Sequence, residues 1–458
     1  MANLLLLLAS RLAGAVGAYI RRVSNDGGTT VDKQHAQEIY TDTNPYDPTL
    51  IQSCDSGKAT VLYNIEPDDS DFTVDRNSTK YVLGSGGTIV SYATDEPAFE
   101  FNADGSYKGL LVEPAATNIC RQSEDISTSW NPITATITTN DTTAPDGNAT
   151  ADKLNDNGGG GTATGVSVVQ ENITVSANTK YTASVFLKAD QLSFASVEAQ
   201  NYDGGTDGRQ FFGLSGAGSL GSPSGIDDSS ITAYPNGWYR CSITWTQGAA
   251  DTSVDIRIYV ASSISDRTVD LDGTSSIFVW GAQLEAGPIA TSYIPTTTAS
   301  VTRVKDDITL GSASSLIGQT EGTLYVEVDF RTVTGATQYI LDVTDGTANN
   351  RLLIFVLTGN TRSYIQSGGS NVLSTFTASL SDGVQKLAFA YANGDQEFYR
   401  NGSSIATGTG SLAALATLTD IDIGQSQGEA FQANMHIRAV ALFTRRLSDA
   451  ECQALTTL

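Results

Sequence analysis

Asp270 and Asp272 lie two residues apart in the stretch VDLDGTSS, where their carboxylates could bind a calcium ion. Calcium prefers hard oxygen ligands, and a chain with 50 acidic residues offers many of them. The stretch lacks the glutamate that completes an EF-hand loop, so a plain turn is the favoured interpretation. Calcium is therefore the one cofactor that the sequence leaves open, with Asp270 and Asp272 as its candidate ligands.

Aromatic rings are the second kind of candidate site, because an exposed ring face can stack on the apolar side of a sugar. Trp238, Tyr259 and Tyr364 are the residues that we single out for this role. Packing between strands is the competing interpretation, and it is the favoured one for each residue taken individually. The sequence alone therefore does not identify the ligand-binding residues.

Catalytic groups are scarce. The chain has two histidines, His35 and His436, and neither suits a Ser-His-Asp triad. We expect His436 to form a hydrogen bond at the start of a strand. Carboxylate pairs for glycoside hydrolysis are abundant, but no motif distinguishes one pair, and a solvated acidic surface explains them. The sequence therefore predicts a protein that is not an enzyme.

The composition describes a chain of short strands joined by many turns. Its 458 residues are enough for two or three domains, and they include 44 glycines but only 17% charged residues. The net charge of −24 repels phosphate backbones, so nucleic-acid binding is not expected. The four cysteines are far apart and form no CxxC pair, which indicates neither a zinc cluster nor a disulfide framework.

Apolar and polar residues alternate along several segments, as they do in half-buried strands. In TSVDIRIYVAS the alternation places Val254, Ile256, Ile258 and Val260 inward. Turn signals such as Asn236-Gly237 separate the segments. The pattern predicts a mainly β protein with two antiparallel β-sandwich (jelly-roll) domains, one over about 119–303 and one over about 304–458.

The N-terminal segment 1–70 begins MANLLLLLASRLAGAVGAYIRR. Helical spacing would place Leu4, Leu8 and Leu12 on one face, which favours a helical or extended arm that docks on a partner. A secretory signal is the alternative, although no basic residues precede the apolar run and Arg11 interrupts it. The run is shorter than the ~20 residues that cross a bilayer, so we expect no membrane insertion.

Two motifs near the N-terminus resemble bacteriophage structural proteins. The first is an aromatic residue, Tyr19, followed closely by RVSNDGGTTV. The second runs from DFTVDRNSTKYV through EPAFEF and GLLVEPAATN to QSED, and it is similar to phage head spike or head fibre proteins. The residues that match are Arg76, Tyr81, Pro97, Phe99, Gly109, Leu110, Leu111, Glu113, Thr117, Asn118, Ser123, Glu124 and Trp130. Ala98 departs from the usual arginine. We expect 71–118 to form a collar of short strands.

The end of the first predicted sandwich also carries this resemblance. FVWGAQLEAGPIATSYIPT is similar to the closing strand of carbohydrate-binding-like sandwiches in those phage proteins. Gly281 permits a bend or bulge there, and Trp280 is expected to pack in the core or at its rim rather than to face a sugar.

The last segment resembles laminin-G/concanavalin-A-like domains. The matching residues, in chain order, are Tyr399, Asn401, Gly402, Ile423, Gly424, Leu442, Phe443, Arg446, Leu447, Ser448 and Glu451. Ser448 and Glu451 have the spacing of a capping box, which predicts a short final helix.

These resemblances imply a virion protein, either a head fibre or spike or a tail fibre. The arm, with Leu4, Leu8, Leu12 and Tyr19, would anchor it to capsid or tail proteins, and the sandwiches would face host-surface or environmental glycans. A homo-oligomer, most simply a trimer, at the virion surface is implied. A secreted bacterial lectin or glycoside hydrolase, and a capsid decoration protein without a ligand, are the alternatives.

Overall fold

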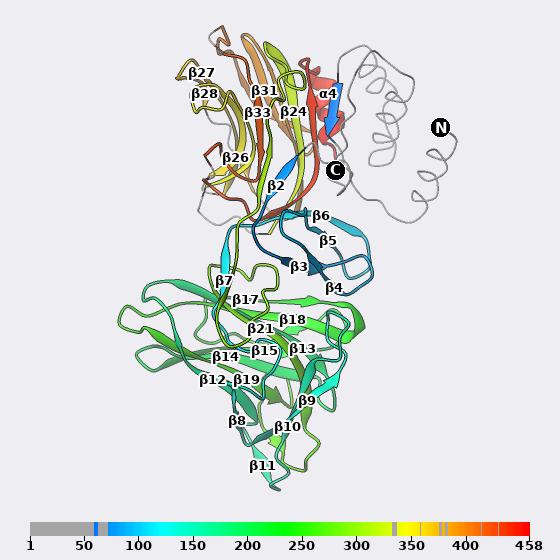
Figure 1. The fold of residues 1–458 in the computed structure, drawn as a ribbon, viewed down its shortest axis with the longest axis vertical. Coiled ribbons are helices and arrows are strands. Elements are labelled where there is room, and N and C mark those ends of the chain that lie inside the picture. Colours follow the sequence, from blue (N-terminus) through cyan, green and yellow to red (C-terminus); the bar gives the residue numbers. More distant parts are fainter. Residues whose placement is uncertain are drawn as a thin grey trace, which may run out of the picture.

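The computed structural model describes residues 59–62, 72–331, 337–357, 359–374, 378–380, 383–413, 415–428 and 430–458. It consists almost entirely of antiparallel strands arranged as two sandwiches, one above the other in Figure 1. The predicted mainly β class is therefore confirmed. The predicted anchoring residues Leu4, Leu8, Leu12 and Tyr19 lie outside the described residues.

The lower sandwich in Figure 1 is formed by one continuous part of the chain. Its first sheet has the order β17 (Asp228–Ala233), β18 (Trp238–Thr246), β13 (Lys180–Ala189), β21 (Ser276–Ala286), β10 (Ala151–Asp156), β9 (Ala135–Thr142). Its second sheet has the order β16 (Ser219–Leu220), β15 (Thr206–Gly213), β14 (Phe194–Asp203), β19 (Ser253–Ala261), β12 (Ser167–Thr174), β8 (Asn131–Ile133). A small ladder joins β11 (Thr162–Ala163) to β20 (Val269–Asp270). The inward positions predicted on β19 are all buried in the core between the sheets.

The upper sandwich has two larger sheets. The first has the order β32 (Ser403–Gly408), β31 (Asp395–Arg400), β30 (Gly383–Ala392), β24 (Glu321–Phe330), β34 (Met435–Phe443), β6 (Tyr107–Val112), β5 (Phe99–Phe101), and β1 (Ala59–Leu62) also pairs with β34. The second has the order β2 (Thr73–Asp75), β23 (Asp307–Leu310), β33 (Asp420–Ile423), β25 (Gln338–Thr344), β26 (Arg351–Leu357), β27 (Asn360–Ser367), β28 (Ser370–Ser374), and β29 (Ala378–Ser379) pairs with β27.

The predicted collar does not stand apart from the sandwiches. Strands β2, β5 and β6 complete both sheets of the upper sandwich, and Phe72, Leu110 and Val112 lie in its core. The short strands β7 (Ala116–Asn118) and β22 (Val301–Arg303) pair with each other where the chain leaves this sandwich and returns to it. The lower sandwich is thus an insertion within the upper one, and long-range pairing rather than chain order sets the boundary.

Buried charges fill the junction between the two sandwiches. Lys80, at the start of the hairpin β3 (Lys80–Leu83) and β4 (Ile89–Tyr92), lies 2.6 Å from Asp306 and 3.3 Å from Glu113. Glu113 also pairs with Arg303 at 3.5 Å and with Arg331. Because Glu113 lies just after β6 and Arg331 just after β24, these ion pairs fix the edge of the upper sandwich against the returning chain.

Several residues of the phage-like motif have structural roles. Arg76 forms an ion pair with Asp306 at 3.0 Å, and Glu113 belongs to the junction. The side-chain amide of Asn118 donates to the carbonyls of Ala282 and Ile294. Ala98, where the family usually has arginine, is buried. The motif therefore encodes how the segment binds to both sandwiches.

Two local predictions are confirmed by the backbone. Gly281 has φ of 65° beside a register shift in the pairing of β13 with β21, and an added Cβ there would lie 2.9 Å from Phe186. The final helix α4 (Asp449–Thr456) begins with a complete capping box, in which Ser448 accepts from the backbone of Glu451 and donates its own N–H to that side chain. A single turn, η1 (Pro235–Gly237), precedes β18.

Candidate functional site

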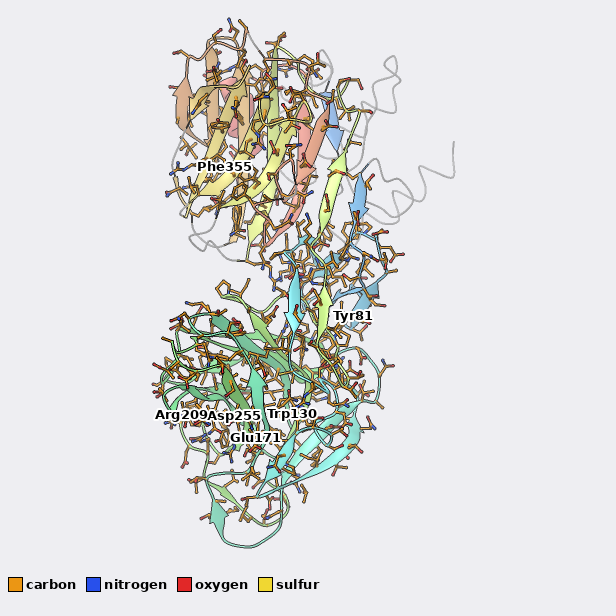
Figure 2. All side chains as sticks on the ribbon, turned by 60° about the vertical axis from the view of Figure 1, so that its left-hand side comes forward. Tyr81, Trp130, Glu171, Arg209, Asp255 and Phe355 are labelled. Atoms are coloured by element: carbon orange, nitrogen blue, oxygen red, sulfur yellow. The ribbon has the colours of Figure 1, made fainter. Side chains whose placement is uncertain are left out.

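Aromatic side chains gather on the outer side of the second sheet of the upper sandwich. We call this surface the aromatic face and define it as the four rings of Tyr339, Phe355, Tyr364 and Phe431 together with the neighbouring Arg351. Side chains alternate between the two faces of a strand, so the buried leucines, isoleucines and valines of β25 to β27 fill the core and the intervening residues point away from it. Cross-strand register places Tyr339 opposite Phe355. Phe355 is labelled on this sandwich in Figure 2.

The rings form a contiguous platform. Tyr339 and Phe431 stack with centroids 4.9 Å apart and planes 18° from parallel. Tyr339 and Phe355 are 5.6 Å apart and tilted by 56°. Phe431 is 50% exposed, so one side of the stacked pair faces solvent. An exposed aromatic cluster of this kind is available to a ligand, because no part of the described chain covers it.

The backbone at Phe431 is in a conformation that phenylalanine rarely adopts. Its φ is 57°, in the left-handed region where a bulky side chain meets steric strain. The carbonyl of the same residue accepts a hydrogen bond from the N–H of Tyr339 at 3.0 Å, which holds the two aromatic residues in register. Strained backbone that the surroundings enforce is a feature of binding sites.

Polar groups surround this platform. The guanidinium of Arg351 lies 5.5 Å from the Tyr339 ring centroid and donates to Asp342 at 3.1 Å. The hydroxyl of Tyr364 donates to the Gln366 side chain at 3.2 Å. Planar charged and amide groups beside aromatic faces can together contact the C–H face and the hydroxyls of a sugar ring.

A pair of carboxylates borders the same face. Asp342 on β25 and Asp422 on β33 lie directly opposite each other in the ladder. Burial raises the pKa of Asp422 to about 7, and the nearby carboxylates of Asp342, Asp307 and Asp420 act in the same direction. The protonated form of Asp422 is therefore present near neutral pH, and a protonated carboxyl can donate a hydrogen bond as well as accept one.

Only one of the three predicted aromatic candidates belongs to this site. Tyr364 lies on the aromatic face and is half-buried. Trp238 is 1% exposed, and its indole N–H donates to the carbonyl of Thr143 at 3.1 Å. The exposed ring that sugar stacking requires is therefore absent at Trp238, and the favoured interpretation, packing, holds because the chain around Thr143 covers the ring.

Tyr259 does not offer a ring face to a ligand either. It points outward from β19, as alternation predicted, but it is only 4% exposed. The guanidinium of Arg267 lies 4.0 Å from its centroid, and that of Arg257 lies 4.7 Å away. These cations cover the ring, so Tyr259 offers no stacking surface and the favoured interpretation, a packed residue, holds.

The calcium candidates form a turn. The carboxylate of Asp272 accepts from the backbone N–H of Thr274 at 2.9 Å and from its hydroxyl at 2.7 Å. Asp270 ends the short strand β20 and is exposed. Across the described ranges, no group of three or more histidine, cysteine, aspartate or glutamate residues is arranged to hold a metal ion.

The sequence did not single out Tyr339 and Phe431. A period of two would place Tyr339 on the core face with Leu341 and Val343, and the register shift between Tyr339 and Leu341 turns it outward, which the pattern does not show. Phe431 lies outside the named strands, and only its close approach to Tyr339 in three dimensions identifies it. The hydrogen bond predicted for His436 is present, since its Nε2 lies 2.6 Å from Glu100. No helix in the described part of the chain has both the length and the apolar character to cross a membrane.

Comparison with known proteins supports the sandwich assignment. The family model described as the concanavalin A-like lectin/glucanases superfamily matches residues 302–453. No curated protein sequence matches the chain.

Solved structures of three other proteins match part of the chain. The CBM40 module of Ruminococcus gnavus IT-sialidase is 19% identical, with 31% of this chain and 86% of that chain covered and a TM-score of 0.28. Domain 4 of AbnA, a GH43 extracellular arabinanase from Geobacillus stearothermophilus in complex with arabinotriose, is 16% identical, with 37% and 82% covered and a TM-score of 0.29. Botulinum neurotoxin type C, which interacts with two ganglioside molecules, is 14% identical, with 33% and 39% covered and a TM-score of 0.28. The laminin-G/concanavalin-A-like resemblance expected for the last segment is thus confirmed for residues 302–453.

Proposed function

We propose that this protein binds carbohydrates through the aromatic face of its upper sandwich and performs no chemistry on them. The observation that carries the proposal is the exposed stack of Tyr339 on Phe431, held at a strained backbone position. The concanavalin A-like match over the same sandwich supports it. Asp342 supports binding without hydrolysis, because its buried carboxylate is already occupied by Arg351.

A glycan array tests this proposal. The full chain is expected to bind a subset of glycans, and the Tyr339→Ala/Phe431→Ala variant is expected to lose at least tenfold in affinity for them. Leu220→Ala is the matched control, because Leu220 is a 44% exposed apolar side chain on the other sandwich. Equal binding by all three proteins would contradict the proposal, and so would release of reducing sugar from a bound glycan.

We further propose that the chain is displayed on a bacteriophage particle as a head fibre, head spike or tail fibre. The support is the motif resemblance at 71–130 and 278–303, together with the leucine-rich start of segment 1–70, which is suited to docking. In this arrangement many copies, most simply homotrimers, would present weak glycan sites at the virion surface and gain avidity.

Incubation with purified particles tests the display. The full chain is expected to bind virion proteins, while the 71–458 fragment is expected to remain in the supernatant. Leu4→Asp/Leu8→Asp/Leu12→Asp in the full chain separates anchoring by these leucines from other effects of truncation. Attachment of the fragment at the level of the full chain would show that the arm is not the anchor.

A further inference from the structure

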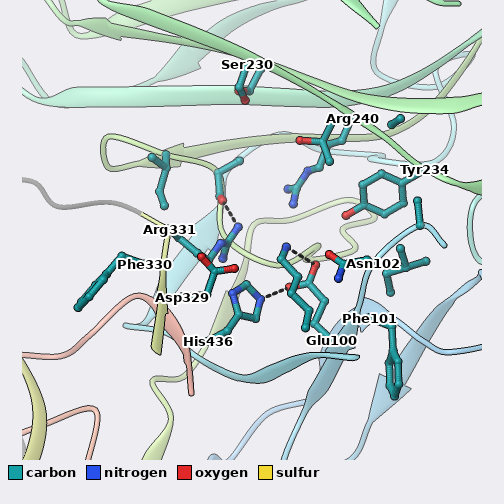
Figure 3. A pocket seen from close by; sticks show the side chains of 18 of the residues that line it. Glu100, Phe101, Asn102, Ser230, Tyr234, Arg240, Asp329, Phe330, Arg331 and His436 are labelled. Carbon is teal, nitrogen blue, oxygen red and sulfur yellow. Dashed lines mark hydrogen bonds and ion pairs between the residues drawn. The ribbon is translucent and has the colours of Figure 1, made fainter. Parts of the chain in front are cut away.

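A polar cleft lies between the two sandwiches, on the side of the molecule where the hairpin β3–β4 and strands β5 and β6 meet the lower one. Its volume is about 410 Å³, within the range of small-ligand sites. Both sandwiches line it, together with the returning segment that contains Ala290. Figure 3 shows the two walls, with Ser230 and Arg240 on one and Glu100, Arg331 and His436 on the other.

The wall of the lower sandwich offers hydroxyls and one cation. Ser230 on β17 and Ser242 on β18 lie side by side, with hydroxyl oxygens 2.7 Å apart. Arg240 donates to the carbonyl of Thr291 at 2.7 Å and to the hydroxyl of Ser184 at 3.0 Å. Both partners are neutral, and within the described residues no carboxylate forms an ion pair with this guanidinium. Its buried Nε has no hydrogen-bond partner there.

The wall of the upper sandwich offers carboxylates and an imidazole. Glu100 accepts from His436 at 2.6 Å and lies 3.5 Å from the ammonium of Lys108. Burial lowers the pKa of His436, so the ring is neutral at pH 7 and its Nε2 carries the hydrogen that Glu100 accepts. The other nitrogen, Nδ1, is then an acceptor. It is buried on the cleft wall and has no partner among the described residues.

The charges that line the cleft balance. Three are positive and three are negative, which leaves a formal sum of zero with His436 neutral. The positive residues are Lys108, Arg240 and Arg331, and the negative ones are Glu100, Asp228 and Asp329. A balanced lining gives no net attraction to an ionic ligand, whereas its closely spaced donors and acceptors suit a ligand with many hydroxyl groups.

We propose that this junction cleft is a second binding site, for a neutral sugar of one or two rings. The guanidinium of Arg240, which is only partly buried, would donate to one sugar hydroxyl, and the exposed hydroxyl of Ser230 would exchange a hydrogen bond with another. The site differs from the aromatic face in position and in chemistry, and it does not depend on the function proposed there.

Saturation-transfer difference NMR and titration calorimetry on the full chain test this site. The probes are the methyl glycosides of glucose, galactose, mannose and N-acetylglucosamine, with lactose and maltose as two-ring probes and N-acetylneuraminic acid as an anionic one. The Tyr339→Ala/Phe431→Ala background removes the aromatic face, so binding that remains reports the cleft. At least one neutral probe is expected to bind this background.

Two further variants in that background locate the binding. Ser230→Trp places a bulky ring in the cleft from an exposed strand position, and Arg240→Gln removes the unpaired cation. Each is expected to weaken the neutral sugar at least tenfold. Thr138→Trp is the matched control, because it adds the same ring at an exposed position on β9. Circular dichroism and thermal melts confirm that each variant is folded.

Three outcomes would overturn the inference: no neutral probe binds the background, the anionic probe alone binds, or Ser230→Trp and Arg240→Gln leave the affinity unchanged. The two proposals fail separately. Loss of all sugar binding in the Tyr339→Ala/Phe431→Ala variant would leave the aromatic face as the site and remove the cleft. Full retention of sugar binding in the Tyr339→Ala/Phe431→Ala variant, with loss of binding when Ser230→Trp is added, would leave the cleft as the site and remove the aromatic face.

Discussion

At the scale of single residues, position in the fold decides what a charged side chain does. Glu113 is completely buried, and its carboxylate is shared by Lys80, Arg303 and Arg331. Cationic neighbours keep the pKa of Glu113 well below its ordinary value although burial opposes ionisation. This cluster is a sealed ion network, whereas Asp422 lies where carboxylates outnumber cations and its pKa moves the other way.

Glu113→Gln is expected to lower the free energy of unfolding by about 3–5 kcal/mol, because it leaves buried cations without their counter-charge. Urea denaturation at pH 7 measures the effect. Glu171→Gln, at an exposed position of the lower sandwich, is the control and is expected to change stability by less than about 0.5 kcal/mol. Similar midpoints for the two variants would show that the network is not needed for stability.

Asp422 predicts a dependence of stability on pH. Its pKa of about 7 in the folded protein exceeds the ordinary value of 3.8, so the folded state binds this proton more tightly than the unfolded state does. The protonated Asp422 side chain therefore contributes fully to the free energy of unfolding below about pH 4, and this contribution is lost as the pH rises through 7. Asp422→Asn removes that proton equilibrium, and the stabilising effect of the substitution should grow between pH 4.5 and pH 7.5 in urea titrations. A constant difference between variant and parent would contradict the shift.

At the scale of elements, alternation predicted the strand that contains residues 254–260 and the direction of its side chains. Alternation placed Val254, Ile256, Ile258 and Val260 inward, and all four are buried. It also placed Tyr259 outward, which is correct for the strand, but Arg257 and Arg267 cover the ring. A period of two shows which way a side chain points and not what lies over it, because the covering residues come from other segments.

The final helix is the element whose start the sequence determined most closely. Ser448→Ala removes the side-chain acceptor of the capping box and is expected to cost about 1 kcal/mol. Chemical denaturation of the full chain measures this cost. Ser403→Ala, an exposed serine at the start of β32, serves as the comparison and should have no measurable effect. A neutral Ser448→Ala would mean that packing of α4, rather than its cap, holds the chain end.

At the scale of the whole molecule, local patterns predicted both sandwiches but not which strands complete the upper one. The pairing of β6 with β34 joins residues more than 300 positions apart in sequence, and no periodicity reports it. The candidate site shows the same limit. Tyr364 was found from its type, whereas the stack of Tyr339 on Phe431 depends on the approach of two separate segments.

The discontinuous architecture makes a prediction about fragments. Residues 116–303 contain every strand of the lower sandwich and both strands of the β7–β22 connection, so this fragment is expected to unfold cooperatively on its own. Residues 304–458 lack β2, β5 and β6, and with them Phe72 and Leu110 of the core. This second fragment is expected to show no cooperative thermal transition, because an open sheet edge and an unfilled core remain. Adding a 72–118 peptide should restore the transition, since it supplies the missing strands. If the 304–458 fragment unfolds cooperatively by itself and the peptide does not change its thermal transition, then β2, β5 and β6 are not needed to complete the upper sandwich.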